Sequence, residues 1–118
     1  MYVCHAVYYY YCARYTRNED HVALMVEIMG NFDRSFVLTG KHRKMYFTKN
    51  GVLKPARKLR PCSLFKFLHS KFGFPHEEAL VISDFLEKAL QLTPAKRWTA
   101  RQLLQHDWFK GTRNGDLI

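Results

Sequence analysis

The sequence predicts an all-α fold with one small hairpin near 45–53, and three observations lead to it. Apolar residues recur at helical spacing in several segments, and these segments are bounded by helix start and stop signals. Apolar content of 47% and aromatic content of 15% favour a packed core over wholesale disorder. The length of 118 residues is enough for one small domain.

The first predicted helix, residues 18–30, carries signals at both ends. Thr16 and Glu19 have the spacing of a capping box, and Gly30 stands where a left-handed C-cap residue is needed. Its apolar stripe consists of Val22, Met25, Val26 and Met29, widened by Leu24 and Ile28. These signals indicate one amphipathic helix.

Asp20 and Glu27 share an edge of this helix, because seven residues make about two turns. A solvated acidic face is the simplest interpretation of such a pair. The alternative is an acidic edge that attracts a basic ligand. The residues alone leave both interpretations open.

From Asn31 to Arg60 the periodicity is poor and basic residues accumulate. No acid occurs between Asp33 and Glu77, while the cations there are Arg34, Lys41, Arg43, Lys44, Lys49, Lys54, Arg57, Lys58, Arg60, Lys66 and Lys71. With a formal net charge of +9, an anionic partner has to be considered beside a solvated face. Asn50-Gly51 is a tight-turn dipeptide and predicts the hairpin near 45–53.

Two further helices follow. Pro61 and Ser63 start one that Gly73 ends, and its apolar residues are Leu64, Phe67, Leu68 and Phe72. Pro75 opens the longest helix, about His76 to Leu92, with a core stripe of Ala79, Ile82, Phe85, Leu86, Ala89 and Leu90.

The segment Pro94–Phe109 predicts a last helix of about two turns. Pro94 ends the preceding helix, and Thr99 with Gln102 forms a capping box. Its apolar stripe consists of Ala100, Leu103, Leu104 and Trp108.

The order of residues in Pro94–Phe109 resembles the last subdomain of eukaryotic protein kinases. Taken together, the predicted helices resemble the SR-protein kinase family. These are CMGC-type Ser/Thr kinases that phosphorylate Arg/Ser-rich splicing factors. The resemblance covers about 14–110. It rests on Tyr15 to Leu24 with Glu27 and Gly30, on Gly40-Lys41, Lys58 to Pro61, Ser63 to Phe65 and Asp84 to Leu86, and on Pro94 to Phe109. It implies the C-terminal helical subdomain, helices G to I, of a kinase C-lobe, and the preceding segment 1–13 is unrelated to the family. The polar residues 111–118, with Asn114-Gly115, are expected to form a flexible tail.

The sequence contains no glycine-rich loop, V-A-I-K lysine, H-R-D, D-F-G or A-P-E motif. No catalytic or cofactor-binding residue can therefore be assigned, although the intact family uses ATP and Mg²⁺. The three cysteines, Cys4, Cys12 and Cys62, form no metal-ligand pattern and fit a reducing compartment. We expect a chain that is inactive alone.

The resemblance also implies a set of site residues. Asp20, Glu27 and Lys71 correspond to positions of the family's substrate-docking groove, whereas Cys62 replaces a groove tryptophan. Arg97 corresponds to a buried cation that pairs with a Glu of the activation segment, and Trp108 is a structural residue. Asp107 stands where the family usually has Pro.

Three functions are weighed. The first is an inactive portion of an SR-protein kinase, and the second is a stand-alone module that binds Arg/Ser-rich segments or a kinase-like partner that covers its exposed helices. The lesser alternative is non-specific RNA binding through 34–71. We expect no membrane association, because no apolar run reaches about 18 residues, and a cytoplasmic and nuclear location.

Overall fold

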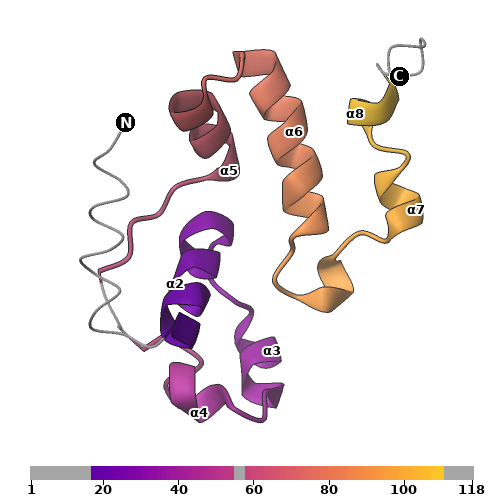
Figure 1. Ribbon diagram of the computed structural model, residues 1–118. Helices are drawn as coiled ribbons and strands as arrows, with labels where there is room; N and C mark the ends of the chain where they lie inside the picture. Colours follow the sequence, from indigo (N-terminus) through magenta and orange to yellow (C-terminus); the bar gives the residue numbers. More distant parts are fainter. Residues whose placement is uncertain (1–16, 55–57, 111–118) are drawn as a thin grey trace. The chain divides into compact units, whose positions relative to one another are not determined.

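The computed structural model describes residues 17–54 and 58–110. The predictions for segment 1–13, for the cap at Thr16 and for the tail 111–118 lie outside these residues. The chain divides into two compact units, residues 1–61 and 62–118. The described residues of both units form helices joined by turns and contain no strand, so the all-α prediction is confirmed (Figure 1).

The first unit is organised by helix α2, Arg17–Met29, which matches the first predicted helix. Ala23 and Val26 are its buried residues, so the predicted stripe does face a core at Val26. The helix ends at Gly30, whose φ of 83° is left-handed and whose N–H donates to the Val26 carbonyl at 2.9 Å. Glycine is favoured there because a Cβ strains this conformation.

Two short helices, α3 (Arg34–Thr39) and α4 (Arg43–Tyr46), follow in the basic stretch where the sequence showed poor periodicity. Val37 is the buried residue of α3. The guanidinium of Arg43 donates to the Leu38 carbonyl and ties the two helices together. Helices of one or two turns carry too few residues for a clear apolar stripe, which is why the sequence did not reveal them.

The predicted hairpin near 45–53 is present in reduced form. Phe47 and Leu53 form an isolated antiparallel bridge, and the Thr48 N–H donates to the Val52 carbonyl at 2.7 Å. Gly51 has the positive φ, 80°, that the tight turn requires. The strand before the turn is shorter than predicted because Tyr46 ends helix α4.

The second unit begins with α5 (Leu64–Lys66), which continues directly into a π-helical segment, η1 (Phe67–Lys71). Ser63 caps α5 by accepting the Lys66 N–H at 3.2 Å, as the sequence predicted. Gly73, with φ of 71°, follows the helical segment. The predicted helix is therefore confirmed, with a widened second half.

Helix α6, His76–Ala89, is the long helix of this unit and ends before the predicted Leu92. Both α5 and α8 (Asp107–Lys110) pack against it, as does α7 (Ala100–Leu103). Its buried residues are Ala79 and Ser83, whose small side chains permit close packing. None of the described helices is long and apolar enough to cross a bilayer.

The C-terminal helix differs from the prediction of about two turns. The capping box is confirmed, since the Thr99 N–H donates to Gln102 Oε1 at 2.8 Å and the Gln102 N–H to Thr99 Oγ1 at 3.3 Å. However, α7 ends at Leu103, and a turn separates it from α8. Trp108 consequently lies on α8, and Leu104 is 67% exposed instead of facing a core.

Candidate functional site

Asp20 and Glu27 both lie on α2, and both side chains are half-buried. A rise of 1.5 Å per residue places them about 10 Å apart along the helix axis. The structure therefore keeps the two acids on one helix edge, as the sequence predicted, with spacing set by a rigid element.

Glu27 has a partner that the sequence did not reveal. Its Oε1 accepts the backbone N–H of Arg60 at 2.8 Å, a contact between residues 33 positions apart. Lys58–Pro61 has no helical or strand structure, and this bond anchors it. A hydrogen bond to a carboxylate is stronger than one between neutral groups, so Glu27 holds this segment against α2.

Lys71, the third residue assigned to docking, is exposed on η1. Its Nζ lies 5.0 Å from the centroid of the Phe67 ring, within the range of a cation–π interaction. The Phe67 ring in turn meets Phe72 edge-to-face at 5.1 Å. Lys71 belongs to the second unit while Asp20 and Glu27 belong to the first, so their union in one groove stays a prediction.

Cys62 is half-buried and its thiol is free. Its Sγ approaches the Ser63 carbonyl at 3.8 Å, a weak hydrogen bond. A thiol offers no aromatic surface, so this position cannot stack against a guanidinium as a tryptophan would. Within the described ranges no group of His, Cys, Asp or Glu could hold a metal ion.

Arg97 is exposed, and its Nε donates to the Gln91 carbonyl at 3.0 Å. The next residue, Trp98, donates its backbone N–H to the Lys88 carbonyl at 3.1 Å. Both bonds fasten the 94–98 turn onto the end of α6. The pairing of Arg97 with an activation-segment Glu stays a prediction.

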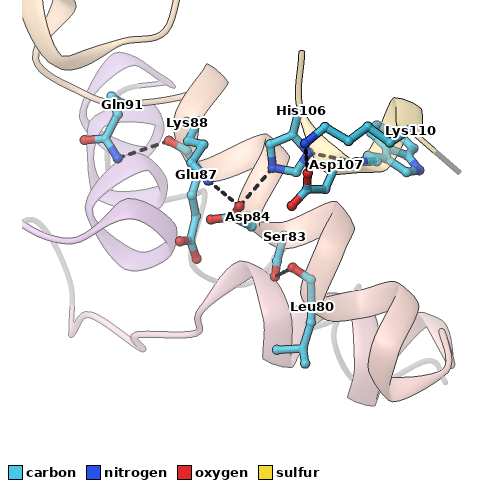
Figure 2. A network of polar contacts seen from close by, with 10 residues as sticks. Leu80, Ser83, Asp84, Glu87, Lys88, Gln91, His106, Asp107 and Lys110 are labelled. Atoms are coloured by element: carbon cyan, nitrogen blue, oxygen red, sulfur yellow. Dashed lines mark hydrogen bonds and ion pairs between the residues drawn. The ribbon is translucent and has the colours of Figure 1, made fainter. Parts of the chain in front are cut away.

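A buried histidine joins α6 to the C-terminal turn. His106 is only 6% exposed, and its Nε2 lies 2.8 Å from Asp84 Oδ2 on α6 (Figure 2). Its Nδ1 accepts the Trp108 N–H at 3.1 Å. Because Nδ1 accepts, the proton of the neutral ring is on Nε2, which donates it to Asp84.

Lys88 completes this network from the same helix as Asp84. Its ammonium group pairs with Asp84 one turn away and lies 4.8 Å from the Trp98 ring centroid. Hydrogen bonds from Lys88 and then from His106 hold the pKa of Asp84 below its ordinary value of 3.8, against a smaller effect of burial. Asp84 is therefore ionised at neutral pH and accepts from both partners.

Aromatic packing surrounds the network. The Phe85 ring meets His106 at 5.5 Å, Trp108 at 4.9 Å and Phe109 at 5.4 Å, each in an edge-on arrangement. Such pairs contribute about 0.5–1.5 kcal/mol beyond the area they bury. Trp108 is 38% exposed within this packing, and its assignment as a structural residue stays a prediction.

Asp84 and His106 both lie in segments that resemble the kinase family, but the sequence did not predict that they contact each other. Twenty-two residues separate them, and no periodicity relates residues on different helices. A polar residue in an apolar neighbourhood, such as His106 among Leu104, Trp108 and Phe109, was the one available signal. The network consists of groups satisfied by one another, which is the chemistry of a structural junction.

Known proteins resemble the chain in sequence, although no family model matches it. It is 43% identical over 96 residues to the serine/threonine-protein kinase SRPK of Physarum polycephalum, covering 80% of the chain and 22% of that kinase. It is 38% identical over 98 residues to the serine/threonine-protein kinase SKY1 of Saccharomyces cerevisiae, covering 83% of the chain and 13% of that kinase. Human SRSF protein kinase 3 is 35% identical over 94 residues, 80% of the chain and 17% of that kinase.

The chain thus spans 13% to 22% of the length of these three relatives. The match extends over both units, because 80% or more of the chain is covered in each case. Together with the all-α architecture, it shows that the chain belongs to the SR-protein kinase family and corresponds to the C-terminal part of the kinase C-lobe.

Proposed function

We propose that the α2 edge formed by Asp20 and Glu27 docks Arg/Ser-rich protein segments. The observation that supports this is the placement of two half-buried acids on one edge of a single helix. An extended Arg-Ser repeat presents every arginine on one face, about 6.7 Å apart. Two long arginine side chains span the acid spacing of about 10 Å along the helix. Carboxylates pair with guanidinium groups through charge-assisted hydrogen bonds.

The bond from Glu27 to Arg60 is compatible with this role. An ionised carboxylate has about four lone-pair sites, so the Arg60 N–H occupies only part of the acceptor capacity of Glu27. The bond also fixes the orientation of the carboxylate before a ligand arrives. Preorganisation of this kind reduces the entropy lost on binding.

The parent activity proposed for an intact kinase of this family is transfer of the ATP γ-phosphate to Ser in Arg/Ser-rich splicing factors. Phosphoryl transfer requires a lysine on the phosphates, metal ligands and an Asp beside the substrate hydroxyl. The motifs that supply them do not occur in this sequence. We expect no phosphate incorporation when the purified chain is incubated with ATP, Mg²⁺ and an Arg/Ser peptide, and incorporation that depends on one of its own side chains would contradict this.

A stand-alone interaction module is the second candidate. Exposed apolar side chains favour it, notably Phe72 at 63% and Leu104 at 67% exposure, since a kinase-like partner could cover them. Analytical ultracentrifugation with a kinase catalytic domain tests this, and a sharp melting transition of the lone monomer would oppose a need for such a partner. A cytoplasmic and nuclear location is part of the same proposal and is checked by imaging a tagged chain.

The docking proposal is tested by titrating the full chain with an unphosphorylated Arg/Ser peptide at low salt. The double variant Asp20→Asn with Glu27→Gln removes both charges, while Gln keeps an acceptor for the Arg60 N–H. We expect about tenfold weaker binding, as two exposed ion pairs contribute up to about 1 kcal/mol each. Binding of the wild-type chain should also weaken as salt is raised.

The matched control is Glu78→Gln with Glu87→Gln, which removes two exposed charges from α6. Its net charge equals that of the test variant, so long-range attraction changes equally in both. We expect the control to bind nearly as the wild type does. Equal affinities of the test and control variants would refute docking at the α2 edge.

A further inference from the structure

The region 34–54 gathers positive charge that the proposed docking role does not use. It contains no Asp or Glu, and its Lys and Arg residues are Arg34, Lys41, Arg43, Lys44, Lys49 and Lys54. Arg43 is half-buried and engaged with the Leu38 carbonyl, whereas the other five are exposed. These five exposed cations are called the basic face below.

The fold fixes the backbone from which these side chains extend. Lys54 directly follows the bridge residue Leu53, and its Nζ donates to the carbonyl of Lys44 on helix α4 at 2.5 Å. This bond holds the end of the hairpin against α4. At the turn, an added Cβ on Gly51 would come within 2.9 Å of the Arg34 Cγ, so the Arg34 side chain rests on the turn. Residues ten and seventeen positions apart are thus held on one small scaffold.

The same unit therefore carries both signs of charge on separate elements. The acids Asp20 and Glu27 lie on α2, which also carries Arg17, whereas the basic face lies on α3, α4, the turn between them and the hairpin. A ligand with one sign of charge is attracted to one element and repelled by the other. A ligand that complements the whole unit has to carry both signs.

A partly phosphorylated Arg/Ser-rich segment has this chemistry. Its arginines are positive, and each phosphoserine adds a charge of about −1.5 to −2 at neutral pH with three strong acceptor oxygens. Lysine ammonium groups bind phosphate as compact point charges with three donors each. We propose that the basic face binds phosphoserines of an Arg/Ser-rich segment whose arginines lie on the α2 edge.

This inference rests on the proposed docking function and extends it from the substrate to its phosphorylated product. The basic face repels an unmodified Arg/Ser-rich segment, because both are positively charged, and it attracts the same segment once its serines carry phosphate. Binding of the phosphorylated segment is therefore tighter than that of the unmodified segment. RNA is the competing polyanion, but it offers no cations to the α2 acids, so the bipolar charge of this unit favours the phosphopeptide.

The experiment compares two peptides of one Arg/Ser sequence, with and without phosphoserine at alternate serines, titrated against the full chain at low salt. The expected result is severalfold tighter binding of the phosphopeptide to the wild type. Lys41→Glu with Lys49→Glu should weaken phosphopeptide binding roughly tenfold, because two exposed pairs become repulsive while the Lys54 bond to the Lys44 carbonyl stays in place. The matched control, Lys66→Glu with Arg101→Glu, makes the same charge change at exposed positions of the second unit and should keep the preference.

Equal affinity of the wild type for the two peptides overturns the inference, and so does an equal loss in the test and control variants. Tighter binding of a uridine oligonucleotide that displaces the phosphopeptide also overturns it, in favour of nucleic acid. Failure of the docking proposal gives a different result. In that case the double variant Asp20→Asn with Glu27→Gln binds the unphosphorylated peptide as tightly as the wild type does. Amide exchange at Gly30, bonded to Val26, verifies that each variant retains the first unit.

Discussion

The two units are held together by different means. In the second unit, Asp84, Lys88 and His106 form a polar junction wrapped by the rings of Phe85 and Trp108. The described core of the first unit consists of Ala23, Val26 and Val37, supported by backbone bonds and a bridged turn. Aromatic and buried polar contacts thus concentrate in the second unit, while the first unit presents separated charges.

This difference indicates a division between stability and recognition. Buried aromatic pairs and satisfied polar groups contribute several kcal/mol where they cluster. Exposed charges contribute little to stability, about 0–1 kcal/mol per pair, but they select partners. Substitutions should therefore unfold the second unit more easily, and alter binding more easily in the first.

The largest effect is expected for His106→Ala. This change removes a buried ring with two hydrogen bonds and leaves the Trp108 N–H without its acceptor. We expect a loss of about 2–4 kcal/mol in the free energy of unfolding. Both tryptophans of the chain, Trp98 and Trp108, lie in the second unit, so urea unfolding followed by tryptophan fluorescence measures it.

His69→Ala provides the control, because His69 is exposed, its hydrogen bond goes to the nearby Phe74 carbonyl at 2.8 Å, and its ring packs against Phe65 and His76 at 5.5 and 5.8 Å. His69→Ala should lower the free energy of unfolding by about 1 kcal/mol or less. Similar midpoints for the two variants would show that the α6–α8 junction does not stabilise the unit.

A smaller effect is expected for Gly51→Ala in the first unit. The residue has a φ of 80°, and the new Cβ would meet the Arg34 Cγ at 2.9 Å. Left-handed backbone costs a residue with a Cβ about 1–2 kcal/mol, and the clash adds to it. Amide exchange of the Gly51 N–H, bonded to the Thr48 carbonyl at 3.0 Å, measures the loss of the turn.

Gly30→Ala separates the two causes, since Gly30 has a similar φ of 83° but nothing within 4 Å of an added Cβ. Amide exchange at the Gly30 N–H measures its effect, which should be the smaller of the two. If Gly30→Ala destabilised the unit as much as Gly51→Ala does, contact with Arg34 would have no part in the effect.

The smallest effect is expected for the loss of stability of the second unit at low pH. The pKa of Asp84 is lowered, chiefly by its bond to Lys88 and then by that to His106. A depressed carboxyl pKa contributes stability that is present above the ordinary value of 3.8 and is lost as pH falls through the lower folded value. Asp84 is 52% exposed, so after solvent screening we expect well under about 1 kcal/mol.

In the Asp84→Asn variant, the free energy of unfolding of the second unit should therefore fall less between about pH 5 and pH 2 than it does in the wild type. Urea midpoints of both proteins across this range measure the change. Asp107→Asn is the control, because the pKa of Asp107 is also lowered, by Lys110, but this pair is the more exposed one, with 67% of the Lys110 side chain and 77% of the Asp107 side chain exposed. A steeper acid loss in Asp84→Asn than in the wild type would contradict the assignment.

Sequence reasoning was most successful where one residue carries a local signal. Gly30, Gly51 and Gly73 all have the positive φ that their turn or cap positions predict, and Thr99 forms the predicted capping box with Gln102. These signals depend on backbone sterics and on partners three residues away. Helix α2 and the start of α5 and α6 followed from the same kind of signal.

What the sequence did not reveal depends on distant partners. Glu27 holds Arg60, and His106 joins Asp84 to the Trp108 N–H. Glu27 and Arg60 are 33 positions apart and Asp84 and His106 are 22 apart, on separate elements, so no spacing rule connects the members of either pair. The break between α7 and α8 was missed for a related reason: Leu104 is apolar and was assigned to a core, although it is exposed.

The π-helical turn η1 has a consequence for how side chains meet along it. Residues five apart on an ordinary α-helix point about 140° away from each other, yet Phe67 and Phe72 are in edge contact. The wider winding permits this meeting and leaves Lys71 beside the same ring. Deleting one residue from 67–71 would restore regular winding, separate the two phenylalanines and rotate the lysine away, so this segment tolerates substitution better than any change of length.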